Sequence, residues 1–131
     1  GGGFIAVEMG HVFSGLGSHV TVFNRSNTLL REFDHDISKR FTEVFGERVE
    51  LLLGHVPTRV ERVADGIKIT CAIGETIVDE LLVATGREQN SDILNFDASG
   101  IECKHHGNVA VDYTMSTNVH GICAIGDISN K

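Results

Sequence analysis

The chain opens with GGGFIAVEMGHVFSGLGSHVTVF (residues 1–23), where a run of glycines precedes two apolar segments. Over residues 3–16 apolar side chains recur at three- and four-residue spacing, which predicts a largely buried helix. Gly15 and Gly17 lie at the end of this pattern, and glycine commonly ends helices. Residues 19–23 are few and rich in β-branched side chains, so they predict a strand. The whole stretch therefore predicts a glycine turn, a helix and a strand in that order.

Residues 34–53 predict a second helix and a second strand. Asp34 or Asp36 can cap a helix that runs to about Phe45. The expected inner face of this helix carries four apolar residues, Ile37, Phe41, Val44 and Phe45. Residues 49–53 are again short and apolar, which predicts a strand. Alternation of strand and helix is typical of a parallel sheet with flanking helices.

Three more β-like runs follow, over residues 58–64, 67–73 and 76–84. The turns expected between them are Asp65-Gly66 and Gly74-Glu75, so the three runs predict an antiparallel meander. Residues 87–108 are polar and loop-like, and strand-like runs return at 109–111 and 122–125. We therefore expect the α/β fold class, as a Rossmann-like parallel sheet with flanking helices and a three-stranded antiparallel meander.

Composition narrows the function. The net charge of −7 argues against a nucleic-acid partner, whose phosphates require a basic face. No apolar run reaches the roughly 18 residues of a membrane span, and no signal segment is recognisable. The three cysteines lie far apart without CxxC or metal-type spacing, which favours reduced thiols in a cytoplasmic protein. Since residue 1 is Gly and not Met, we expect the N-terminus to be a cut end.

Gly1 to Ala6 fit the pattern G-x-G-x-x-A, which opens dinucleotide-binding helices. Gly1 permits a tight turn, Gly3 lets the backbone approach a pyrophosphate, and Ala6 is small enough for the helix to lie against the sheet. The free N–H groups of the first helical turn, at Phe4 and Ile5, would face the anion along with the positive end of the helix dipole. By itself the pattern is also compatible with a plain glycine loop.

The residues after the strand at 19–23 indicate which dinucleotide would bind. An acidic residue there would bind the ribose 2′-hydroxyl of NAD, whereas this chain has Asn24 and Arg25, with Arg31 further along. A guanidinium group is permanently charged and matches phosphate oxygens, so both arginines suit the 2′-phosphate of NADP. The alternative is that the two arginines are solvated surface residues.

Three motifs in this order resemble the NAD(P)-binding domain of the FAD-dependent pyridine nucleotide–disulfide reductases. They are the G-x-G-x-x-A-x-E start, Ala84-Thr85-Gly86-Arg87 with Asn90, and Gly121 to Asp127 with the sequence GICAIGD. The resemblance covers essentially the whole chain. FNRSNTLLREFD is most similar to the NADPH-using members, and the N-terminal stretch with LLREFD and LLVATGR is most similar to the mycothione reductases.

The resemblance implies roles at the matching positions only. Glu8 matches a glutamate that lies close to the nicotinamide and helps to couple it to the flavin. Ala84, Thr85 and Gly86 match the segment where the chain leaves the nucleotide domain near the cofactor. Gly126 and Asp127 match the second FAD-binding motif, whose aspartate accepts a hydrogen bond from the flavin ribityl chain.

Two further expectations concern cysteine and histidine. Cys123 stands where the family usually has an aromatic residue, so we expect a buried structural cysteine without a redox role. His105 and His106 lie beside Gly107-Asn108 and are expected to form an exposed turn. No metal site is expected.

The resemblance also implies a division of the chain. Residues 1–88 would form the NADP(H)-binding domain, with its first strand truncated, and residues 89–131 the segment that returns to the FAD-binding domain. The parent enzyme, expected to be a homodimer, would pass a hydride from NADPH to FAD and then reduce a small-molecule disulfide, with a mycothione-type substrate favoured. Since the family's Cys-x4-Cys pair and C-terminal His-Glu pair are not in these residues, we expect this piece alone to be inactive.

Other functions remain open at this stage. Dihydrolipoamide dehydrogenase is one, and an NAD(P)H oxidase or ferredoxin reductase, which lacks the redox disulfide, is another. A dinucleotide-sensing module would be a non-enzymatic alternative. Asp127 argues against the sensor, because a sensor has no use for a flavin-binding aspartate.

Overall fold

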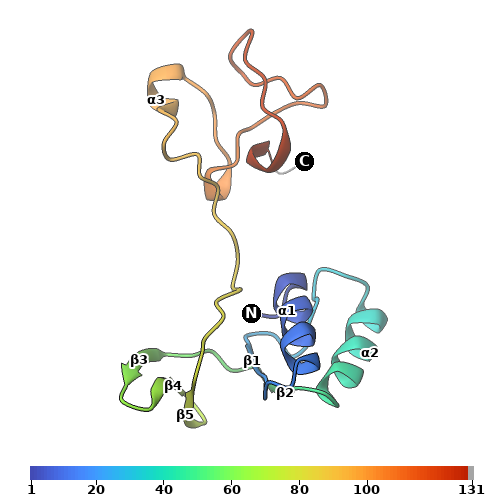
Figure 1. Cartoon of the computed structure of the whole chain (residues 1–131). Helices are drawn as coiled ribbons and strands as arrows, with labels where there is room; N and C mark the ends of the chain where they lie inside the picture. The colour runs from blue at the N-terminus through green and yellow to red at the C-terminus, as the bar shows by residue number, and fades with distance from the viewer. Residues whose placement is uncertain (130–131) are drawn as a thin grey trace. The chain divides into compact units, whose positions relative to one another are not determined.

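The structure, a computed structural model, describes residues 1–129 except the His105 side chain (Figure 1). Its contacts group the chain into two compact units, the first unit Gly1–Gly86 and the second unit Arg87–Lys131. The first unit holds a two-stranded parallel sheet and a three-stranded antiparallel sheet. Helices, a parallel pair and a meander confirm the predicted Rossmann-like α/β class. Within the described residues, no helix has the length and apolar character needed to cross a membrane.

Helix α1 spans Phe4–Gly15 and is followed by strand β1, Thr21–Asn24, as the sequence predicts. The expectation that this helix is largely buried is wrong. Its buried residues are Ala6, Val7 and Gly10, whereas most of its large apolar side chains are exposed. The reason is that α1 meets the core along one narrow stripe, and side chains off that stripe remain in solvent.

Helix α2, His35–Gly46, leads to strand β2, Glu50–Leu53, which completes the two-stranded parallel sheet. Asp34 caps the helix, because its Oδ1 accepts hydrogen bonds from the N–H groups of Asp36 at 3.0 Å and Ile37 at 3.3 Å. Strand β2 lies parallel to β1, with Thr21 opposite Glu50. Helix and strand are therefore confirmed close to their predicted bounds.

The prediction of which α2 residues face inward is partly wrong. Phe45 is buried, but Ile37 is exposed and so is Val44. The buried residues of α2 are Ser38, Thr42 and Phe45. Two hydroxyl-bearing residues thus replace two apolar ones on the inner face, because their hydroxyl groups find hydrogen-bond partners there.

The core of the first unit joins both helices, β1 and the loop after β1. Its buried cluster consists of Val7, Val22, Leu29, Phe45 and Val49. The side chain of Phe45 also stacks on Phe41, with ring centroids 5.3 Å apart. This core fixes the end of β1 against the start of α1, where the candidate site lies.

The meander consists of β3, Arg59–Val63, β4, Gly66–Cys71, and β5, Gly74–Val78. The three strands and their antiparallel pairing are confirmed. The two turns lie earlier than predicted, at residues 64–65 and 72–73, because Gly66 and Gly74 pair as the first residues of their strands with φ of 135° and 137°. The third strand is also shorter than expected, since residues 79–84, all described, form no strand.

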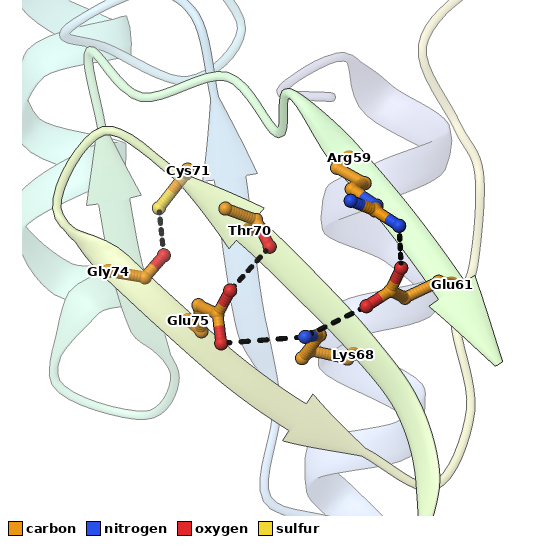
Figure 2. Close-up of polar contacts among 7 residues, drawn as sticks. All are labelled: Arg59, Glu61, Lys68, Thr70, Cys71, Gly74 and Glu75. Atoms are coloured by element: carbon orange, nitrogen blue, oxygen red, sulfur yellow. Dashed lines mark hydrogen bonds and ion pairs between the residues drawn. The ribbon is translucent and has the colours of Figure 1, made fainter. Parts of the chain in front are cut away.

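Charged side chains bridge the three meander strands (Figure 2). Lys68 Nζ lies 2.8 Å from Glu61 Oε1 and 3.6 Å from Glu75 Oε2, and Arg59 also pairs with Glu61 at 2.5 Å. The hydrogen bond from Lys68 lowers the pKa of the Glu61 carboxyl, and the same contact raises the pKa of Lys68. These pairs support the register of the sheet.

The second unit is built of short turns. It contains α3, Phe96–Ser99, and two 3-10 turns, η1, His105–Gly107, and η2, Gly126–Ser129. The strand-like runs at 109–111 and 122–125 form only isolated bridges, Cys103 with Val109 and Ser116 with Cys123. These runs have the side chains of strands, but among the described residues no neighbouring strand completes a ladder with them. For the same reason Cys123 is exposed, which corrects the expectation of a buried cysteine.

Candidate functional site

The glycine turn at the start of α1 is tight on one side and open on the other. A Cβ on Gly1 would collide with the carbonyl of Ala84, and one on Gly2 would lie 2.6 Å from the side-chain amide of Asn24. A Cβ on Gly3, in contrast, would find no described atom within 4 Å. Gly1 and Gly2 are therefore required by neighbouring protein atoms, whereas Gly3 leaves space where a ligand could approach the backbone.

Gly3 is also the N-cap residue of α1. Among the described residues no side chain caps this end, and no acidic residue lies in the first turn. The N–H groups of the first turn, which include those of Phe4 and Ile5, have no helical carbonyl four residues before them to accept a hydrogen bond. An uncapped helix start beside an open glycine fits the pyrophosphate of a dinucleotide.

Asn24, at the end of β1, is buried. Its Nδ2 donates hydrogen bonds to the carbonyls of Ser26 at 3.0 Å and Thr28 at 2.9 Å. The Asn24 carbonyl accepts a hydrogen bond from the N–H of His55 at 3.1 Å. The side chain of Asn24 therefore shapes the loop after β1, and its two donor protons are used within the protein.

The two arginines lie on this loop, residues 25–33, which we call the arginine loop. Arg25 is exposed, and within residues 1–129 no ion pair involves it. Arg31 is also largely exposed, and its Nε donates to Glu32 Oε1 at 2.9 Å. Both guanidinium groups are accessible to an anion. To bind it, Arg31 would have to leave the exposed carboxylate of Glu32.

The remaining predicted residues fall in both units. Glu8 is exposed on α1. Ala84 and Thr85 lie beside Gly1, and Gly86 follows with φ of 156°. These residues and the arginine loop all belong to the first unit.

Gly126 and Asp127 belong to the second unit, at the start of η2, where Gly126 has φ of 76°. Asp127 Oδ2 accepts a hydrogen bond from Arg87 Nη2 at 3.0 Å, with both side chains exposed. No cluster of three or more His, Cys, Asp or Glu that could hold a metal ion occurs among the described residues.

Sequence reasoning missed several residues that shape this site. Gly2 is one, because its carbonyl accepts a hydrogen bond from the N–H of Leu30 at 2.7 Å and so ties the arginine loop to the glycine turn. Ser38 and Thr42 are others, since both bond to the loop backbone. Their spacing of four residues on the face of α2 that carries Phe45 is the signal that could have revealed them.

Comparison with known proteins adds to this geometry. The sequence matches the family described as Pyridine nucleotide-disulphide oxidoreductase over residues 1–131. The mycothione reductase of Mycobacterium tuberculosis is 39% identical over 131 residues, which are 99% of this chain and 28% of that protein. The chain thus spans less than a third of the length of this relative.

Solved structures agree in fold. The HOCl-induced flavoprotein disulfide reductase RclA from Escherichia coli superposes with a TM-score of 0.90 at 27% identity, over 99% of this chain and 30% of that one. An engineered water-forming NADPH oxidase bound to NADPH has a TM-score of 0.79 at 24% identity, over 89% of this chain and 26% of that one, which shows the fold alone. From the match along its whole length, this chain belongs to the pyridine nucleotide–disulphide oxidoreductase family.

Proposed function

We propose that this chain is the NADP(H)-binding part of a flavoprotein disulfide reductase that oxidises NADPH and reduces a low-molecular-weight disulfide of the mycothione type. In this proposal residues 1–88 bind the nucleotide, and residues 89–131 lead back to an FAD-binding domain. The substrate class is supported by the 39% identity to mycothione reductase. The partners of the chain are then FAD and the disulfide substrate.

The observation that carries the proposal is the open backbone at Gly3 beside an uncapped helix. In the first turn of α1, N–H groups and the positive helix end are directed where a pyrophosphate would bind. A side chain at Gly3 would fill this space, although no atom of the described residues lies close enough to require glycine there. The arrangement serves an anionic ligand better than it serves the packing of the chain.

The choice of NADP over NAD is supported by the arginine loop. A 2′-phosphate carries a charge of roughly −1.5 to −2 near neutrality. Arg25 and Arg31 present permanent positive charges, and the residue before Arg25 is an uncharged, inward-facing asparagine. A carboxylate that would repel the phosphate is therefore absent from position 24.

The engineered NADPH oxidase carries substitutions that resemble the residues at the start of the arginine loop. It derives from an NADH oxidase of Lactobacillus brevis by five substitutions, two of which introduce arginines six positions apart. The others include the removal of an aspartate directly before the first new arginine and the placement of a serine directly after it. Here Arg25 and Arg31 are also six positions apart, with Asn24 before Arg25 and Ser26 after it.

The chain's own residues bind and orient, whereas FAD supplies the capacity to accept a hydride and pass electrons onward. Glu8 would lie on the nicotinamide side of α1, and Ala84 to Gly86 would border the same ligand. Asp127 has the chemistry to accept a hydrogen bond from a flavin hydroxyl. For that it would turn from Arg87, its present exposed donor.

The test compares both nucleotides in the holoenzyme. Arg25→Met with Arg31→Met should lower kcat/KM for NADPH by roughly a hundredfold, since each charged hydrogen bond contributes about 1.5–3 kcal/mol. We expect kcat/KM for NADH to change little, because NADH has no 2′-phosphate. Glu32→Gln is the matched control, as it releases Arg31 from its ion pair and should leave NADPH use intact or improve it. Equal losses for both nucleotides in the double variant would show that the arginines do not read the phosphate.

A further inference from the structure

The arginine loop is attached to α2 through two buried hydroxyl groups. The N–H of Leu29 donates to Thr42 Oγ1 at 2.9 Å, and Ser38 Oγ donates to the carbonyl of Leu30 at 2.7 Å. The side chain of Leu29 is fully buried in the core cluster. Two consecutive loop residues are therefore held by both backbone and side-chain contacts, immediately before Arg31.

The two hydroxyl groups form a linked set. Thr42 Oγ1 also donates to the carbonyl of Ser38 at 2.7 Å, so it accepts from the loop and donates to its own helix. Ser38 is 3% exposed and Thr42 is 8% exposed. At this burial bulk water cannot readily replace a lost partner, so removing the Thr42 hydroxyl would leave the N–H of Leu29 without this hydrogen bond. Removing the Ser38 hydroxyl would leave the Leu30 carbonyl to its other donor, the N–H of Phe33 at 2.9 Å.

Leu30 shows that these contacts impose a conformation. Its φ is 52°, a left-handed value that is unfavourable for a residue with a branched side chain. Its N–H donates to the carbonyl of Gly2 and its carbonyl accepts from Ser38, so both of its backbone groups are held. The direction in which the chain enters Arg31 is consequently set from α2 on one side and from the glycine turn on the other.

We propose that Ser38 and Thr42 are positioning residues for nucleotide selection, which hold the arginine loop so that Arg31 meets the 2′-phosphate of NADP(H). They would not touch the nucleotide themselves. This inference rests on the proposed reading of the 2′-phosphate by Arg25 and Arg31. It adds that the preference is built into α2, outside the loop that carries the charges.

The test removes each hydroxyl without changing the shape of the side chain much. In the holoenzyme, Thr42→Val should raise KM for NADPH roughly tenfold, the effect of about one lost buried hydrogen bond, with kcat unchanged. KM for NADH should stay within about twofold, because NADH makes no contact with the 2′-phosphate subsite. Ser38→Ala should act in the same direction. Thr42→Ser, which keeps the hydroxyl, should restore most of the NADPH affinity.

A control separates positioning from stability. Val49→Ala removes apolar volume from the same core cluster but leaves both hydroxyl groups in place. It should lower Tm while the ratio of KM for NADPH to KM for NADH stays unchanged. If Thr42→Val raised both KM values equally, or if Thr42→Ser behaved like Thr42→Val, the positioning role would be wrong.

The arginine variants distinguish this inference from the function on which it rests. If Arg25→Met with Arg31→Met abolishes the NADPH preference while Thr42→Val leaves it at the wild-type value, only the positioning role fails. If the arginine variant itself keeps the preference, the reading of the phosphate fails and the positioning role fails with it. A loss of preference in the arginine variant and a roughly tenfold weaker preference in Thr42→Val, with rescue by Thr42→Ser, supports both.

Discussion

The interactions inside the first unit differ from those inside the second unit. The first unit has a buried cluster that includes Val7, Val22 and Phe45, together with two sheets. In the second unit Val109 is the one buried hydrophobic residue among those described, and the ordered structure consists of turns and isolated bridges. Stability in the first unit thus comes mainly from apolar burial, and in the second unit mainly from hydrogen bonds of loops.

The loops of the second unit are organised by polar side chains. Asp112 Oδ1 accepts hydrogen bonds from the N–H groups of Thr114 at 2.8 Å and Ser116 at 3.0 Å. Asn118 links two other segments, because it donates to the carbonyl of Gly100 at 2.8 Å and accepts from the N–H of Glu102 at 2.9 Å. Such contacts follow no apolar periodicity, so a chain can be well ordered where its sequence reads as a loop.

The largest expected difference in stability between the two units follows the loss of a core side chain in the first unit. Phe45→Ala should lower the free energy of unfolding of the first unit by about 3–5 kcal/mol, through lost burial and a residual cavity. Ile93→Ala, an exposed position in the second unit, should change stability by less than about 0.5 kcal/mol. Urea denaturation followed by circular dichroism measures both. Similar losses for the two variants would remove the distinction between the units.

A smaller difference in stability is expected when one asparagine from each unit is replaced by alanine. Asn24→Ala removes the two hydrogen bonds that this buried side chain donates to the half-buried carbonyls of Ser26 and Thr28 and should cost about 1–3 kcal/mol. Asn118→Ala removes two bonds that lie in solvent, where water can replace them, and should cost about 1 kcal/mol or less. The midpoint of thermal unfolding orders the two variants. A greater loss at Asn118 would mean that polar contacts are worth more in the second unit than burial suggests.

The smallest effect concerns the charged side chains of the meander. The pKa of Glu61 lies below its ordinary value of 4.5 because Lys68 donates a hydrogen bond to it, so its ion pair stabilises the folded state at neutral pH. That contribution is present above the unfolded-state pKa and is lost as pH falls through the lower folded-state pKa. Glu61→Gln should therefore flatten the fall in stability between about pH 5 and pH 3. The raised pKa of Lys68 works in the other direction, and its contribution is lost as pH rises above 10.5.

Thermal unfolding of wild type and Glu61→Gln across this pH range measures the difference. The side chains are partly exposed, so 1 M salt should reduce it. If stability falls by the same amount at low pH in wild type and in Glu61→Gln, the side-chain ion pair contributes nothing and the backbone hydrogen bonds hold the meander.

The order of elements could be predicted from the sequence, because it depends on local patterns. Asp34 before an amphipathic segment locates the start of α2, and glycine near residue 66 locates a hairpin. The side-chain environment could not be predicted as well. Ser38 and Thr42 are polar by type, and their burial depends on loop backbone groups that the sequence does not place beside them.

The candidate site shows the same limit. G-x-G-x-x-A predicts the glycine turn, but the contact of Gly2 with Asn24 and the contact of Gly1 with Ala84 require the folded structure. The exposure of Cys123 could not be foreseen either, since it depends on whether a neighbouring strand covers the run at 122–125. Residues with a local role were predictable, and residues with a role between segments were not.

The register of the two sheets has a consequence for the order in which the first unit folds. The meander strands are joined by two-residue turns, so their loops close at little entropic cost. Thr21 and Glu50 are 29 positions apart, so the parallel pair must close a much longer segment that contains the arginine loop and α2. We therefore expect the surface offered to the nucleotide to be completed only when that long segment closes, later than the meander that follows it in the sequence.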